Sequence, residues 1–175
     1  MTLPHYEIYA IKYAHHERSS RENFVGGDSH DVPMPLDYFV WAIRGGGRTW
    51  VLDTGFSAEV AKQRGREFIR CPGAGLSLLG IDPDTVSDVI ISHMHYDHAG
   101  NTRKLPKTSF HLQEREMAFA TGKEMRHAFM RRAYDPSDVC DLVYANFQER
   151  LAFHEGAYEL RPGITVHWVG GHTRG

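Results

Sequence analysis

A short run of potential metal ligands constrains this sequence more than any other feature. The stretch "SHMHYDHAGN", residues 92–101, contains His93, His95, Asp97 and His98, and follows "VSDVII", which is apolar enough for a strand buried on both faces. Alternation along an extended chain puts His93 and His95 on the same side, so both imidazoles can reach one ion. Asp97 and His98 come where the chain turns toward a helix. The pattern therefore predicts a metal site rather than four unrelated loop residues.

The ligand types narrow the choice of metal. Imidazole and carboxylate suit Zn, Mn, Fe or Co, and no thiolate lies in the motif. The two cysteines, Cys71 and Cys140, are too few for a disulfide framework, and we interpret both as free, buried thiols in a reducing cytoplasm. Met94 and Tyr96, between the ligands, are expected to pack rather than to react.

Two further segments end on side chains of the same kind. "TWVLDTG" leads to Asp53, and "HWVGGHTRG" leads to His172 after a pair of glycines that allows a sharp turn. Either residue alone would be read as an ordinary turn or loop residue. Because strand ends are where an α/β fold assembles its site, we expect both to join the motif.

Extended and helical patterns alternate along the chain, which predicts one α/β domain over residues 1–175. Loops are expected over 14–35 and 71–84. The expected strands are 6–14, a glycine-turned hairpin over 37–55, 86–92, 108–113, 151–156 and 163–171, and the expected helices are 57–68 with Ser57 as N-cap, 114–132 and 137–150.

The net charge of the chain indicates which classes of binding partner to expect. The formal net charge is −2, which provides no general attraction to nucleic acid or to an anionic membrane. No run of apolar residues approaches the eighteen or so that a membrane span requires, and no secretory signal is visible. A small-molecule substrate is the partner expected.

Taken with Asp53 in "LDTG" and His172 in "GGHTRG", the His-x-His-x-Asp-His motif resembles the metallo-β-lactamase superfamily, and within it the N-acyl homoserine lactonase group. The resemblance implies an αββα sandwich, of which this chain is expected to hold the N-terminal part, because the family's bridging aspartate and last histidine ligand are not found in it. An isolated part of this kind would leave one face of its sheet uncovered.

The resemblance also implies the site. It assigns His93, His95 and His172 to one divalent ion and Asp97 and His98 to a second, with zinc as the first choice, and makes Asp53 a carboxylate that orients the ligands. The implied reaction is opening of a lactone ring by metal-activated hydroxide, with Asp97 passing a proton to the leaving alkoxide. A homodimer is expected, in the cytoplasm that the free cysteines indicate. A glyoxalase II-type thioesterase or another hydrolase of this fold stays open as an alternative, as does a non-catalytic metal-binding module.

Overall fold

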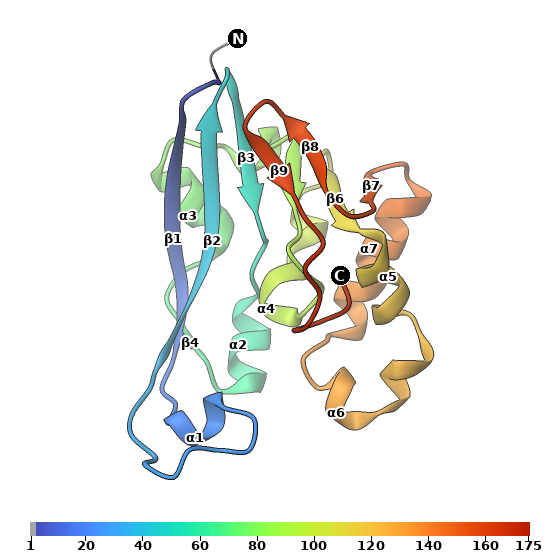
Figure 1. Cartoon of the computed structure of the whole chain (residues 1–175). Coiled ribbons are helices and arrows are strands. Elements are labelled where there is room, and N and C mark those ends of the chain that lie inside the picture. Colours follow the sequence, from blue (N-terminus) through green and yellow to red (C-terminus); the bar gives the residue numbers. More distant parts are fainter. Residues whose placement is uncertain (1–2) are drawn as a thin grey trace.

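A seven-stranded mixed sheet organises the protein in the computed structural model, which describes residues 3–175 (Figure 1). The strand order is β4-β1-β2-β3-β5-β6-β7. Strands β4, β1, β2 and β3 pair antiparallel, whereas β3, β5, β6 and β7 run parallel. Their bounds are β1 Tyr6–His16, β2 Leu36–Gly45, β3 Arg48–Leu52, β4 Glu67–Phe68, β5 Asp88–Ile90, β6 Ser109–Gln113 and β7 Leu151–His154.

Helices cover one face of this sheet and a hairpin covers part of the other. The hairpin consists of β8 (Tyr158–Arg161) and β9 (Ile164–Val166), which form a separate two-stranded sheet. The helices are α1 Ser20–Asn23, α2 Ala58–Arg64, α3 Pro72–Leu78, α4 Tyr96–Ala99, α5 Glu114–Ala120, α6 Ala128–Arg131 and α7 Pro136–Phe147, with short 3₁₀ turns at Pro83–Thr85, Thr102–Lys104 and Lys123–Arg126. This arrangement confirms the predicted α/β class.

The main core lies between the sheet and the helices. Its largest fully buried side chains include Tyr13 of β1, Val40 of β2, Phe110 of β6 and Leu142 of α7. A smaller cluster under the hairpin joins Trp50, Ile90 and Ile164. The hairpin leaves part of its face of the sheet open: Ile8 of β1 is 64% exposed and Trp41 of β2 is 36% exposed.

Local sequence signals explain where several elements begin and end. Helix α2 starts after Ser57, whose hydroxyl accepts a hydrogen bond from the Val60 amide, and ends at Gly65 in the left-handed region (φ +65°). Asp135 caps α7 in the same way, with Pro136 at the first helical position. Gly46 and Gly47, both with positive φ, turn the β2–β3 hairpin as predicted.

The structure corrects several predicted elements. Residues 72–78, expected in a loop, form α3, and Glu67–Phe68, expected at the end of a helix, pair with β1 as β4. Strand β8 was not predicted, and β9 ends at Val166, well short of residue 171. The expected helix over 114–132 is broken into α5, a 3₁₀ turn and α6, and the expected loop over 14–35 contains the end of β1 and α1.

The cysteines also differ from the prediction. Both are unpaired, but Cys71 is half-buried and Cys140 is exposed on α7, so the expected burial of both thiols is wrong. Within residues 3–175, none of the helices combines the length and the apolar character that crossing a bilayer would require.

Candidate metal site

The site forms at the carboxyl ends of two neighbouring parallel strands. Strand β3 leads directly to Asp53, and β5 leads to Ser92 and His93. Asp53 is 4% exposed and adopts a left-handed conformation (φ +64°), which aspartate tolerates better than most residues. The Asp53 carboxylate therefore lies at the end of a strand and next to the histidine motif, as predicted.

Asp53 accepts hydrogen bonds from both ends of the motif. Its Oδ1 accepts from the Ser92 amide (2.8 Å), and its Oδ2 accepts from the Ser92 hydroxyl (2.9 Å). The Nδ1 of His98 lies 2.7 Å from Oδ2. A hydrogen bond from Nδ1–H to a carboxylate leaves Nε2 as the ring atom with a free lone pair, which is the arrangement seen in histidine ligands of metals.

Three histidines converge beside this carboxylate. His93 Nε2 and His172 Nε2 each lie 3.1 Å from His95 Nδ1. One nitrogen from each ring can be chosen so that all lie within 4.8 Å of one another, and residues 3–175 contain no other such group of histidine, cysteine or acidic side chains. Three imidazole nitrogens so close together fit a divalent metal ion, because neutral imidazole is a common ligand of such ions.

The electrostatics of the three-histidine cluster also favour metal binding. Burial, and then the neighbouring histidines, lower the pKa of His93 to about 2 and that of His95 to about 4. Both rings are therefore neutral at pH 7, which is the form that binds metals.

Asp97 and His98 lie together on α4, beside the three histidines. Asp97 Oδ2 is 3.4 Å from His98 Nε2. Burial alone would lower the pKa of His98, but its hydrogen bonds to Asp53 and Asp97 raise it to about 10. Burial would raise the pKa of Asp97, and the bond to His98 instead lowers it. The pair is thus an ionised carboxylate next to a protonated imidazole, whose Nε2 proton would have to leave for a metal ion to bind there.

His172 reaches the cluster from a loop and not from a strand end. Strand β9 stops at Val166, and the last segment then passes beside α4 (Figure 1). The Trp168 indole donates to the Arg174 carbonyl (2.7 Å), and the Gly170 amide donates to the Gly175 carbonyl (3.2 Å). The prediction that His172 joins the motif agrees with its position, although the predicted strand does not extend that far.

Several supporting residues were not predicted. Tyr13, buried in β1, donates from its hydroxyl to the carbonyl of Asp97 (2.8 Å), and the Thr54 amide donates to the carbonyl of His98 (2.8 Å).

Met94 is fully buried and Tyr96 is 7% exposed, with the Arg64 guanidinium 3.8 Å from the centre of the Tyr96 ring. The packing roles expected for Met94 and Tyr96 agree with these contacts.

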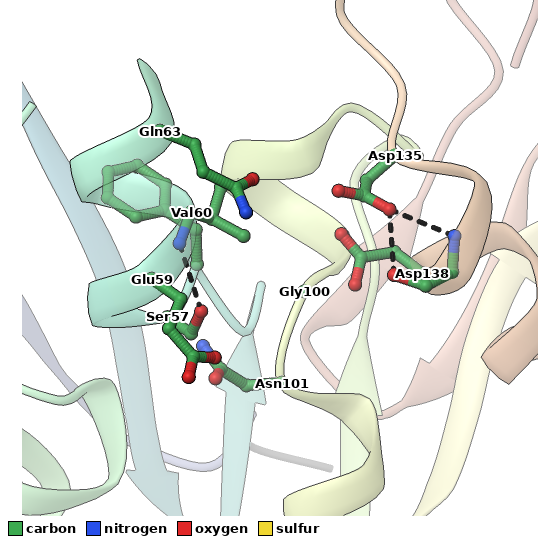
Figure 2. Close-up of a pocket in the computed structure, with 10 residues that line it drawn as sticks. Ser57, Glu59, Val60, Gln63, Gly100, Asn101, Asp135 and Asp138 are labelled. Atoms are coloured by element: carbon green, nitrogen blue, oxygen red, sulfur yellow. Dashed lines mark hydrogen bonds between the residues drawn. The ribbon is translucent and has the colours of Figure 1, made fainter. Parts of the chain in front are cut away.

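An acidic cavity lies close by but contains none of the predicted ligands. It has a volume of about 250 Å³ and lies between α2 and the start of α7, against Gly100 and Asn101 (Figure 2). Glu59, Asp135 and Asp138 line it. Burial, and then the charges of Asp135 and Asp141, raise the pKa of Asp138 to about 7. Asp135 and Asp138 are also the N-cap and first-turn residues of α7, which accounts for their presence.

Comparison with known proteins agrees with this geometry. Residues 34–175 match the family model of the metallo-beta-lactamase superfamily. The N-acyl homoserine lactonase AiiA of Bacillus thuringiensis subsp. kurstaki is 30% identical over 100 residues, which are 57% of this chain and 34% of that protein. The matched segment thus spans about a third of this relative.

Solved structures show the same fold over the whole chain. An N-acyl homoserine lactone hydrolase with N-hexanoyl-L-homoserine bound at its catalytic metal centre is similar with a TM-score of 0.74 and 20% identity, covering 100% of this chain and 69% of that one. A probable metal-dependent hydrolase from Staphylococcus aureus gives a TM-score of 0.72 at 16% identity, covering 100% and 68%.

Proposed function

Because the chain belongs to the metallo-β-lactamase superfamily, we propose that it acts within a metal-dependent hydrolase that opens the ring of an N-acyl homoserine lactone or a related lactone. The observation that carries this proposal is the convergence of His93, His95 and His172 beside the Asp53 carboxylate. The lactonase relative at 30% identity supports the choice of substrate class. With a homoserine lactone as substrate, the biological result would be quorum quenching.

Two divalent ions, zinc first, complete the proposed site. His93, His95 and His172 would hold one ion, and Asp97 and His98 would contribute to the second. In this proposal the 175 residues contribute only Asp97 and His98 to the second ion, and they cover 69% of the solved lactone hydrolase.

The chain's own residues then have distinct tasks. A bound divalent ion would supply an activated water at neutral pH and polarise the lactone carbonyl. Asp53 fixes the tautomer of His98 through Nδ1, so that Nε2 faces the site. Asp97, an acid with a lowered pKa, would accept the proton of the attacking water and deliver it to the departing ring oxygen, which yields an open-chain hydroxy acid.

The substrate assignment is tested with the zinc-loaded protein and N-hexanoyl homoserine lactone in a pH-indicator assay, since ring opening releases a proton. We expect turnover that His93→Ala abolishes and that His127→Ala, at an exposed histidine on another loop, leaves unchanged. Cleavage of thioesters without any lactone opening would move the assignment to the thioesterase branch. Binding of zinc with no hydrolysis of either class would favour a non-catalytic module.

Assembly and location are part of the same proposal. We propose a homodimer and a cytoplasmic location, and the two unpaired cysteines support the location. Light scattering coupled to size-exclusion chromatography would give twice the protomer mass if the dimer forms.

A further inference from the structure

The buried Glu116 joins three segments that surround the histidine cluster. Its side chain is 0% exposed and comes from α5, an element that carries none of the proposed ligands. Its Oε1 accepts from the Met94 amide (2.8 Å) and from the Tyr134 hydroxyl (3.1 Å). Its Oε2 accepts from the Gly175 amide (3.1 Å).

The positions of these donors matter more than their number. Met94 lies between His93 and His95, and Gly175 lies three residues after His172, so one carboxylate holds both ligand-bearing segments. Along the chain, His95 and His172 are 77 residues apart. The third donor, Tyr134, also contacts the cluster, because its ring packs edge-on against the His95 ring with centroids 4.7 Å apart.

The segment that follows His172 packs very closely against Glu116. A Cβ atom added at Gly175 would overlap the side chain and backbone of Glu116, so the segment that follows His172 is seated directly on this glutamate. Trp168 and Gly170 form hydrogen bonds only within the segment or to Gly156. Two cation–π contacts also join the segment to α5: the Arg115 guanidinium lies 4.1 Å from the centre of the Trp168 ring, and that of Arg174 lies 5.9 Å from the centre of the Phe119 ring.

We infer that Glu116 is a positioning residue that sets the distance between the His93/His95 pair and His172, and that it thereby tunes the affinity of the three-histidine site for a divalent ion. A buried carboxylate that accepts hydrogen bonds from three donors is a rigid connector, since the release of any one donor would leave that buried group without a partner. The inference rests on the proposed function in that it takes the three histidines as metal ligands.

The test measures binding of Co²⁺ alone, followed by its visible absorption, and does not depend on hydrolysis. Glu116→Gln keeps the shape of the side chain, but its amide NH₂ must face one of three donors. The carbonyl oxygen satisfies two donors if it faces Met94 and Tyr134, so the mismatch falls on Gly175. We expect the Co²⁺ affinity to fall by roughly tenfold to a hundredfold, as for other residues that orient ligands. Glu114→Gln, at an exposed glutamate on the same helix, should leave the affinity unchanged.

A double-mutant comparison separates positioning from general stability. If Glu116 acts through the segment that carries His172, Glu116→Gln should change the affinity by less than about twofold in a His172→Ala background. Gly175→Ala, which pushes against Glu116 from the other side, should weaken Co²⁺ binding as Glu116→Gln does, and it keeps the test valid if the glutamine variant does not fold.

Parent-like Co²⁺ affinity and spectrum in Glu116→Gln, or in Gly175→Ala, would overturn the inference even if the variants melt at lower temperature. Failure of the parent protein to bind Co²⁺ at all would overturn the metal site itself and with it the proposed function. Absence of lactone opening in a parent that binds Co²⁺ would overturn only the substrate assignment and leave the role of Glu116 in place.

Discussion

At the scale of single residues, Asp53 is the side chain on which the histidine motif depends most directly. It accepts from Ser92 twice and from His98 once, and it is almost fully buried. Asp53→Asn keeps the shape but replaces one acceptor oxygen by a donor, so Ser92 or His98 loses its partner. We expect affinity for Zn²⁺ to fall by roughly tenfold to a hundredfold, measured by competition with a chromophoric chelator.

Asp31→Asn is the matched control for Asp53. Asp31 also has a positive φ (+45°), but it is exposed, in the loop between β1 and β2. Unchanged Zn²⁺ affinity in both variants would show that Asp53 does not orient the ligands.

A second prediction at this scale concerns pH. The pKa of Asp138 is raised to about 7 from an ordinary 3.8, so the folded protein binds this proton more tightly than the unfolded chain does. Stability is therefore lost as the pH rises from about 4 to 7. Asp138→Asn removes this loss and should raise the free energy of unfolding by about 1 kcal/mol at pH 8, after allowance for the partial exposure of the group.

Urea unfolding at several pH values measures the effect of Asp138→Asn. The gain should vanish below pH 4, where the carboxyl is protonated in both states. Asp84→Asn, at an exposed aspartate, should show no such trend. A gain that is the same at pH 4 and pH 8 would contradict the electrostatic explanation.

Residue patterns predict the site only in part. The four proposed ligands of the motif stand so close together in the sequence that metal binding can be predicted from them without a structure. Glu116 and Tyr13 are different, because they act on backbone groups of Met94 and Asp97 that are distant in sequence. Hydrogen bonds to a backbone amide or carbonyl have no residue-type signature, so only the fold shows them.

At the scale of elements, α3 shows why sequence propensity alone predicted a loop where the protein has a helix. "CPGAGLSLLG" is rich in glycine, which favours a loop, yet Pro72 suits the first helical position and the helix packs on β1. Gly75 approaches Ile11 so closely that an added Cβ would overlap the Ile11 side chain. Tertiary packing thus uses the missing side chain that propensity counts against the helix.

Two substitutions in α3 test this explanation. Gly75→Ala should destabilise the protein by about 1 to 3 kcal/mol through overpacking against Ile11, although alanine is the better helix former. Gly73→Ala, two residues earlier, would meet Pro83 at an ordinary 3.4 Å and should be neutral or stabilising by a few tenths of a kcal/mol. Urea denaturation compares the two. Equal effects would mean that the contact with β1 does not set the requirement for glycine at position 75.

Elements with a local sequence signal were predicted, and β8, which has none, was missed. The β2–β3 hairpin follows from alternating apolar residues around a glycine turn, and α2 follows from its Ser57 cap. Strand β8 has no comparable signal, because three of its four residues are exposed or charged and its pairing with β9 supplies most of its order. Its position on the far face of the sheet depends on the Trp50–Ile90–Ile164 cluster, which is not local in sequence.

At the scale of the whole molecule, the histidine cluster connects parts of the chain that are otherwise weakly joined. The motif is anchored in the parallel half of the sheet. The segment after β9 is held by Glu116, by the His172 ring and by contacts of Trp168 and Arg174 with α5. A ligand that binds only the folded arrangement stabilises it by mass action, and one that bridges two segments also opposes local opening of the less stable segment.

Zn²⁺ at a hundredfold excess over its dissociation constant should therefore raise the free energy of unfolding by about 2.7 kcal/mol relative to the protein in a chelator. Hydrogen exchange should slow most in residues 167–175, because binding holds His172 against His95. His172→Ala should reduce the zinc-dependent stabilisation and remove the protection of this segment, while the exposed His127→Ala keeps both. If zinc stabilised the His172→Ala variant as much as the parent, the ion would be bound by the motif alone, and the bridging role of the last segment would be wrong.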